Sequence, residues 1–337
     1  MLHISSFIAV VCVMFSALAA HASECLTQRN NLGVQQEILD AAKAETLREP
    51  SLYENGNHRA FTISKDGTDR AVIMGTFHLA NARTTYLPPQ VHTIFLNADR
   101  LIVETDISKV APDRMIRFRA AVNALMFNEG GAQAALAVDR ASDGKIHKII
   151  SAMGIHADQL SKVSLLGIES LLSGHYCSDS IQLYNQGGHP LDIILTAWAN
   201  LLSKEVIGIE PIETYLRLIA NPNPSTSSSI ISLMVRRDDI RSKILDFQLE
   251  QYFSGHIGYV IGAERGYMAN FEERDAMLHR SSSFVEVRNV DFVAAIEKTL
   301  NRPGQTFVAV GAEHLIGNNG VIALLMQRGW AITPLDF

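Results

Sequence analysis

TFVAVGAEHL, residues 306–315, is an apolar run rich in β-branched residues that ends in a glycine, two further residues, a histidine and a leucine. The stretch AVIMGTFHL, residues 71–79, has the same plan near the other end of the chain. Neither run alternates strictly between apolar and polar residues, which is typical of inner strands covered on both faces. Because the chain leaves the sheet abruptly at each glycine, we expect these positions to need a positive φ or a close backbone approach. The two stretches predict an α/β protein with His78 and His314 at strand ends.

Two further apolar runs end in carboxylates. Leu101–Val103 precedes Glu104, and Val206–Ile209 precedes Glu210. In open α/β sheets, ligands bind outside the carboxyl ends of the strands, because loops and helix starts there present side chains to one crevice. We therefore expect two imidazoles and two carboxylates to converge at one edge of the sheet.

Each of these residues also has an ordinary structural interpretation. A Gly-x-x-His pattern occurs again at 144–147 without a strand before it, so only its repetition after two strand-like runs is informative. The glutamates could simply pair with Arg288 or Arg83. Asp106 and Glu313, which lie next to the candidate residues, are expected to have structural or solvated roles.

Short apolar runs elsewhere predict the remaining strands. The Asp-Gly step at 66–67 predicts a hairpin that joins strands at 61–64 and 71–74. Residues 330–334 can form a closing strand. The stretch 221–229, with its prolines, asparagines and serines, is expected to be a flexible loop.

Longer stretches with helical spacing separate these runs. The expected helices cover residues 90–98, 112–128, 144–153, 191–202, 230–253, 290–300 and 321–328. Asn318 or Asn319 is expected to cap the last of them, and Gly329 to end it. Together these elements predict one α/β domain over residues 23–337, with a central mixed sheet flanked by helices and a helical insertion at about 112–186.

The composition narrows the classes of function. The chain has 337 residues, of which 47% are hydrophobic and 19% are charged, so it is long enough to bury a sizeable core. With 29 basic against 35 acidic side chains, the net charge is −6. No basic patch points to DNA or RNA, so a nucleic-acid partner is not expected.

The first residues are typical of a secretory signal peptide. Residues 7–20 are apolar and uncharged, and an Ala-His-Ala sequence at 20–22 resembles a cleavage site. We expect cleavage after residue 22 and export, to the periplasm in a Gram-negative cell; an uncleaved anchor is the alternative. No later segment is expected to span a membrane. Cys25 and Cys177 would then be the two cysteines of the exported chain, either joined in a disulfide or as separate thiols.

These motifs, taken in order, resemble the TraB/PrgY/GumN family, which also contains the Tiki proteases. The segments that carry the resemblance are Gly75-Thr76-Phe77-His78 with Leu87-Pro88-Pro89, Val103-Glu104, Val206-Ile207-Gly208-Ile209-Glu210, Arg288-Asn289, and Gly311-Ala312-Glu313-His314-Leu315 with Gly317, Gly320, Leu324, Leu325 and Gly329. The resemblance covers roughly residues 55–334. It implies a fold shared in outline with erythromycin esterases and, by analogy with the Tiki members, metal-dependent proteolysis.

The resemblance also assigns site positions to this sequence. They are His78, His314, Glu104, Glu210 and Arg288. The sequence differs from the family's usual pattern at two neighbouring positions. Pro211 replaces the threonine that usually follows the second glutamate, so this position has no side-chain hydroxyl, and Glu313 is charged where small residues are common.

Imidazole and carboxylate together are ligands for a divalent metal such as Zn²⁺, Mn²⁺ or Co²⁺. His78, His314 and Glu104 would form a three-ligand site, and the metal would lower the pKa of a bound water toward ~7. Glu210 could act as general base, and Arg288 could stabilise charge on a substrate oxygen. The expected function is metal-dependent hydrolysis of a peptide.

Two alternatives remain open at this stage. A metal-independent, esterase-like hydrolase could activate water with a histidine oriented by the carboxylates. A non-catalytic protein could bind a peptide or a metal complex in the same crevice. The sequence has no G-x-S-x-G, P-loop or H-E-x-x-H segment, which argues against a serine triad, nucleotide chemistry and ordinary zincin chemistry. It does not indicate the oligomeric state.

Overall fold

A computed structural model describes residues 32–78, 84–127, 146, 148, 162–174, 189–220 and 223–337. Its centre is a six-stranded mixed sheet in the order β4-β3-β5-β2-β1-β6. The strands are β1 (Ala60–Lys65), β2 (Thr68–Thr76), β3 (Arg100–Val103), β4 (Glu205–Gly208), β5 (Thr306–Gly311) and β6 (Ala331–Pro334). All six correspond to runs that the sequence predicted, so the mixed α/β fold is confirmed.

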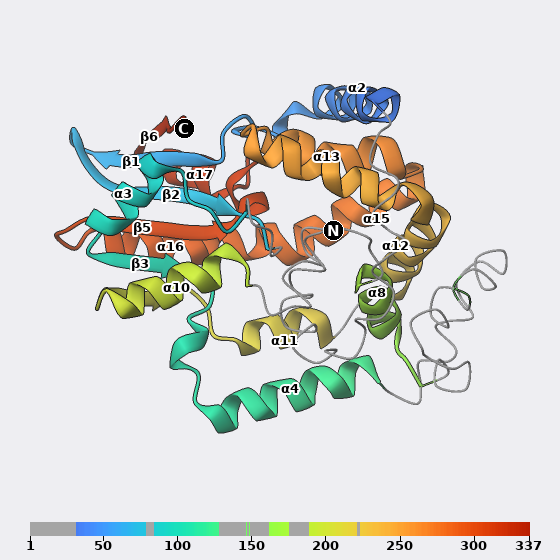
Figure 1. Cartoon of the computed structure of the whole chain (residues 1–337), viewed down its shortest axis with the longest axis horizontal. Coiled ribbons are helices and arrows are strands. Elements are labelled where there is room, and N and C mark those ends of the chain that lie inside the picture. The colour runs from blue at the N-terminus through green and yellow to red at the C-terminus, as the bar shows by residue number, and fades with distance from the viewer. Residues whose placement is uncertain are drawn as a thin grey trace.

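Four neighbouring strands run in the same direction. β4, β3, β5 and β2 pair in parallel, whereas β1 is antiparallel to both β2 and β6. The carboxyl ends of the four parallel strands therefore meet at one edge of the sheet. β5, from the C-terminal part of the chain, lies between β2 and β3, from the N-terminal part (Figure 1).

The predicted hairpin joins β1 to β2. Asp66 has φ 51° and Gly67 has φ 72°, so both residues of the two-residue turn adopt the left-handed conformation. An Asp-Gly pair suits this turn because glycine has no Cβ and aspartate tolerates a positive φ better than most residues.

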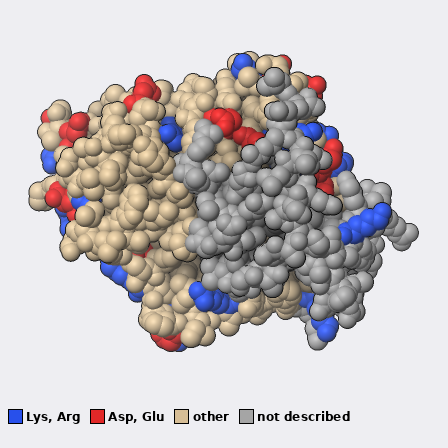
Figure 2. All heavy atoms as spheres, viewed as in Figure 1, with Lys and Arg blue, Asp and Glu red and all other residues tan. Residues whose placement is uncertain are grey.

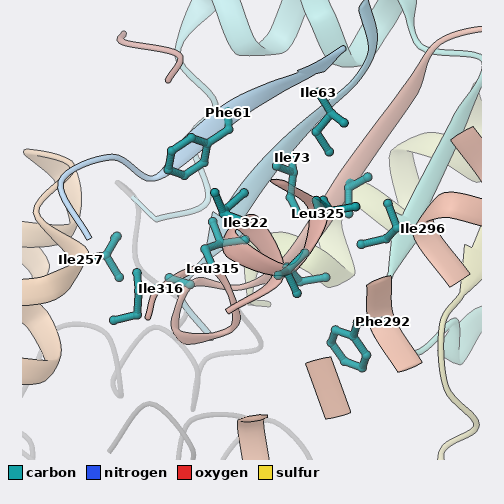
Figure 3. Packing of buried hydrophobic residues seen from close by; sticks show 14 of the residues in the cluster. Phe61, Ile63, Ile73, Ile257, Phe292, Ile296, Leu315, Ile316, Ile322 and Leu325 are labelled. Carbon is teal, nitrogen blue, oxygen red and sulfur yellow. The ribbon is translucent and has the colours of Figure 1, made fainter. Parts of the chain in front are cut away.

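Helices cover both faces of the sheet. On one face α3 (Pro89–Asn97) and α10 (Leu191–Leu201) pack through residues such as Phe95 and Leu195 against Val72 and Phe307. On the other face α13 (Arg241–Phe253), α14 (Ile257–Ala263), α16 (Val287–Leu300) and α17 (Val321–Gln327) contribute to a larger core. Figure 3 shows part of that core, in which Ile322 and Leu325 of α17 lie near Ile73; Phe292 and Ile296 of α16 belong to the same cluster. Burial on both faces explains why the inner strands read as continuous apolar runs.

Most of the other helices form a group beside the sheet (Figure 1). They are α2 (Leu32–Arg48), α4 (Pro112–Met126), α8 (Leu165–Gly174), α11 (Glu213–Ala220), α12 (Pro224–Arg236) and α15 (Phe271–Ser281). The π-helical turn η8 (Ser282–Glu286) joins α15 directly to α16. Figure 2 shows basic and acidic side chains interspersed over the described part of one face, which is consistent with the small net charge.

The predicted loop at 221–229 and the predicted helix at 230–253 are both wrong in their bounds. Helix α12 begins within the expected loop at Pro224, because Asn223 Oδ1 accepts the backbone N–H groups of Ser225 and Thr226. The chain then breaks at the short 3-10 helix η6 (Asp238–Ile240) before α13 begins. The serines that suggested flexibility are part of the first turns of a capped helix; residues 221 and 222 lie outside the described residues.

The cap predicted for the last helix is also wrong. Gly320, rather than Asn318 or Asn319, is the N-cap of α17. The backbone N–H of Asn318 instead donates to Ser51 O, and the Asn319 side chain donates to Glu286. The predicted stop is confirmed, since Gly329 follows the helix with φ 83°.

Several expectations fall on residues outside the described part of the chain. They are the signal peptide at 1–22, Cys25 and Cys177, the helix at 144–153 apart from residues 146 and 148, and most of the insertion at 112–186, of which α4 and α8 are described. Within the described ranges, no helix is long and apolar enough to cross a membrane.

Candidate active site

Four strand ends bring the candidate residues to one place. His78 follows β2 by two residues, and Glu104 comes directly after β3. Glu210 follows β4 by two residues, and His314 lies in the 3-10 helix η9 (Ala312–Leu315) directly after β5. Because these strands are parallel, the polar side chains emerge at the same edge.

Small residues at the strand ends allow the close approach. A Cβ on Gly311 would lie 2.8 Å from His78 Nε2 and 3.1 Å from Glu104 Oε1. Gly311 has φ −53°, so the constraint there is space rather than a left-handed backbone. A Cβ on Gly75 would lie 2.8 Å from Ala312 Cα. The glycine before each histidine is thus needed for packing between the two loops.

Both imidazoles point their Nε2 atoms toward the same carboxylate oxygen. Glu104 Oε1 lies 3.5 Å from His78 Nε2 and 3.8 Å from His314 Nε2. The two ring nitrogens are therefore no farther apart than about 7.3 Å, the sum of these distances. Glu104 Oε1 also accepts the backbone N–H of Gly311 at 2.6 Å. Histidines more than 230 positions apart in sequence thus face one carboxylate oxygen.

His314 is oriented by neighbours on α16. Its Nδ1 lies 2.6 Å from Asn289 Oδ1, and Asn289 Nδ2 donates to Asn319 O at 2.8 Å. The second bond fixes the amide orientation, so His314 Nδ1 must carry the proton and Nε2 is left to face Glu104. The ring also packs on Phe292, with centroids 4.6 Å apart. Sequence reasoning gave Asn289 no role, although its position next to Arg288 was a signal.

His78 has a second carboxylate neighbour that the sequence analysis missed. Its Nδ1 lies 3.6 Å from Asp192 Oδ1, in the first turn of α10. Burial lowers the pKa of His78, but Asp192 and Glu104 outweigh burial and raise it to about 10. Nothing in the sequence distinguishes Asp192 from an ordinary aspartate at a helix start. The backbone before His78 is held by Tyr252, whose hydroxyl donates to Gly75 O at 2.8 Å.

Arg288 links the two glutamates. Its Nη2 donates to Glu104 Oε2 at 2.8 Å, and its Nε donates to Glu210 Oε2 at 3.1 Å. A further contact joins Nη2 to Glu210 Oε1, so the pairing with Glu210 is bidentate. The guanidinium also lies 4.9 Å from the Phe292 ring centroid. The ordinary interpretation of Arg288, an ion pair with the glutamates, is therefore present in the structure.

The two glutamates differ in acidity. Burial disfavours ionised Glu104, but His314, Arg288 and His78 outweigh it and hold the pKa of Glu104 well below its usual range. Burial raises the pKa of Glu210, Glu104 adds to this effect, and Arg288 only partly opposes it. Two carboxylates in one site thus have opposite tendencies to hold a proton.

A comparison with family models supports the resemblance seen in the motifs. The TraB/PrgY/gumN family model matches residues 60–334, which is most of the chain. The protein belongs to the TraB/PrgY/gumN family. No curated protein and no solved structure matches it.

Two neighbouring acids of this TraB/PrgY/gumN protein have structural roles. Asp106 is the N-cap of the 3-10 helix η5 (Ile107–Lys109), where it accepts the backbone N–H of Ser108. Glu313 accepts the hydroxyl of Ser281 at 2.6 Å and lies 3.4 Å from Arg265. Arg83, the other predicted ion-pair partner, lies outside the described residues.

The donor types of this TraB/PrgY/gumN site are suited to a divalent metal. Two imidazole nitrogens face a carboxylate oxygen, and each ring has an oxygen acceptor near its other nitrogen, as metal-bound histidines generally do. As the side chains stand, however, the described residues include no group of three or more His, Cys, Asp or Glu that could hold a metal ion. The fit is therefore one of ligand chemistry, and the ligand set stays a prediction.

Proposed function

We propose that this TraB/PrgY/gumN protein is a hydrolase that cleaves a peptide or ester bond with water activated at the carboxyl edge of the sheet. One observation carries the proposal: the Nε2 atoms of His78 and His314 both point to Glu104 Oε1. Water bound among these groups would contact a carboxylate and two imidazoles. Both kinds of group are common general acids and bases in acyl transfer.

The difference between the glutamates supports a division of roles. Glu104 stays ionised and accepts hydrogen bonds, so it would hold water and the imidazoles in place. Glu210, whose pKa is raised, would accept a proton from the attacking water and return it to the leaving group. Arg288 would keep both carboxylates in position, and its charge would stabilise negative charge on the substrate oxygen.

A divalent metal is part of this proposal. His78, His314 and Glu104 would be its ligands, and the metal would supply a Lewis acid that lowers the pKa of water. His78, which carries a proton near neutral pH in the metal-free protein, would release it on binding, so that two neutral nitrogens and an anionic oxygen form a set that Zn²⁺ and Mn²⁺ accept.

The test compares purified wild-type protein with His78→Ala, His314→Ala and a control, His92→Ala, which removes an exposed histidine of α3. Bound metal is measured by mass spectrometry, and turnover is measured on a peptide library and on activated esters. We expect the two site variants to lose metal and turnover, while the control keeps both. Glu210→Gln should bind metal normally and lower kcat by roughly 10²–10⁴-fold.

Other results would favour the alternatives. Metal retention without turnover on any substrate would indicate a binding protein. Ester cleavage that depends on the histidines but not on metal, and that survives a chelator, would indicate the metal-independent hydrolase.

A further inference from the structure

Asp192 stands out because part of its carboxylate is buried without a hydrogen-bond partner. Its Oδ1 atom is shielded from solvent and has no partner within hydrogen-bond distance among the described residues. Buried polar atoms are rarely left in this state, so each exception calls for a physical reason. A candidate partner among the described residues is His78 Nδ1, 3.6 Å away, just beyond hydrogen-bond distance.

The position of Asp192 in α10 does not explain this orientation. Asp192 is the second residue of a helix whose N-cap is Pro190, and an acid there is ordinarily favoured by the helix dipole alone. Its carboxylate nevertheless approaches an imidazole that belongs to a different strand end. The contact therefore joins α10, which covers one face of the sheet, to the loop after β2.

The two histidines of the site have matching surroundings. His314 Nδ1 faces Asn289 Oδ1, from the helix that packs on one face of the sheet. His78 Nδ1 faces Asp192 Oδ1, from a helix on the other face. In both rings the opposite nitrogen, Nε2, points to Glu104. A carboxylate cannot donate a hydrogen bond, so a bond between Asp192 and His78 requires the proton to be on Nδ1.

We propose that Asp192 is a positioning residue that holds the proton of His78 on Nδ1, so that proton exchange and ligand binding take place at Nε2. The distance of 3.6 Å is slightly longer than a hydrogen bond, and catalytic hydrogen bonds are often long in structures without substrate. The inference deepens the proposed function, and its catalytic consequence rests on that function.

The experiment uses ¹⁵N-histidine-labelled protein without added metal or substrate, with the His78 signals identified by their loss in His78→Gln. Asp192→Asn keeps an oxygen acceptor, and Asp192→Leu removes it. The control, Asp113→Asn, also changes the acid at the second residue of a helix, but its partner Arg117 is on the surface. Thermal unfolding and the His314 signals check that each variant is folded.

We expect His78 Nδ1 to be protonated in the wild type, in Asp192→Asn and in the control. At a pH at which the ring carries a single proton, that proton should lie on Nε2 in Asp192→Leu, because Glu104 faces Nε2 and no acceptor then faces Nδ1. Folded Asp192→Leu protein with the ring-nitrogen spectrum of the wild type would overturn the inference.

Activity measurements separate this inference from the proposed function. Where the wild type turns over substrate, Asp192→Leu should lower kcat at least tenfold, and Asp192→Asn should recover most of the loss. A wild type without turnover would contradict the proposed hydrolase but leave the spectroscopic result intact. An Asp192→Leu variant with full kcat would contradict the positioning role.

Discussion

At the scale of single residues, the site requires that residue 311 has no Cβ atom. Gly311 lies where three side chains meet, and a Cβ there would come within 3.5 Å of His78, Glu104 and His314 atoms alike. Every other residue would push at least one of these groups out of place. The glycine of this Gly-x-x-His motif is therefore required by the space between the side chains of the site.

Gly311→Ala should displace His78 or Glu104 and lower kcat strongly. Overpacking of this kind typically destabilises a protein by about 1–3 kcal/mol. Gly258→Ala in α14 is the control, because its Cβ would meet only ordinary contacts at 3.6 Å and beyond. Urea unfolding and turnover measure both effects. Full activity in Gly311→Ala would show that the side chains around Gly311 are not the reacting groups.

The free energy of unfolding should depend on pH because His78 binds its proton more tightly in the folded protein than in the unfolded chain. Its pKa is 6.5 in an unfolded chain and about 10 in the folded protein, so the folded state holds the proton more tightly. The stabilisation is fully present below about pH 6.5 and is lost as the pH rises toward 10. In the presence of a chelator, the excess stability of the wild type over His78→Gln should therefore shrink across this range. A difference that stays constant with pH would contradict the assignment.

At the scale of elements, Arg288 connects three of them. It lies on α16 and pairs with Glu104 after β3 and Glu210 after β4. The π-helical turn η8 directly precedes α16, and its Phe284 carbonyl accepts a hydrogen bond from Arg288 Nη1 at 3.4 Å. This turn changes the helix register just before Arg288 and Asn289, whose side chains contact Glu104, Glu210 and His314.

Arg288→Met should leave two partly buried carboxylates without their partner. Loss of one member of a buried ion pair costs about 3–5 kcal/mol. The control is Arg302→Met, since Arg302 pairs with Glu205 on the surface, where the loss should be slight. Chemical unfolding of both variants gives the comparison. Equal losses would mean that the Arg288 pairs do not stabilise the fold.

The cap of α12 allows a separate test of an element that the sequence analysis misjudged. Asn223→Ala should lower the free energy of unfolding by about 1 kcal/mol, because two backbone N–H groups lose their acceptor. Asn318→Ala, at a position where the sequence suggested a cap and the structure places none, should have little effect. If the two variants lose equal stability, the capping assignment is wrong. Neither should change kcat.

Strands were more predictable than helices for a physical reason. Inner strands are buried on both faces, so their apolar runs and terminal glycines are visible in the sequence without knowledge of any partner. The start of α12 depends instead on one asparagine side chain. The composition of this segment, rich in proline and serine, favours a loop, but the cap formed by Asn223 stabilises the first turn of a helix. Asp192 of α10 looks like any helix-start acid, and only its distance to His78 distinguishes it.

At the scale of the whole molecule, the site is a product of the strand order. β5 inserts between β2 and β3, which brings residues near 311 beside residues near 76 and 104. No local segment contains two of the proposed metal ligands, His78, Glu104 and His314. A ligand held by all three can therefore bind only to the folded chain.

This dependence predicts that metal binding stabilises the whole protein. Saturating Zn²⁺ or Mn²⁺ should raise Tm, with a gain of roughly 2.7 kcal/mol at a hundredfold excess over Kd. The His78→Ala/His314→Ala double variant should show no such rise, whereas His92→Ala should behave as the wild type. Calorimetry with and without metal gives the measurement. Equal shifts in all three proteins would place any bound metal elsewhere.

The sequence by itself determined the strands, their glycine ends, and the polar residues that follow them, because these depend on local chemistry and on burial that leaves a pattern along the chain. It also indicated the family. Only the tertiary structure decided that both histidines face one oxygen of Glu104 and that Arg288 pairs with two carboxylates. It also decided that Asp192 faces Nδ1 of His78 and that Asn289 faces Nδ1 of His314. Those contacts join residues far apart in sequence, and their distances follow from strand order and helix packing, which no local pattern encodes.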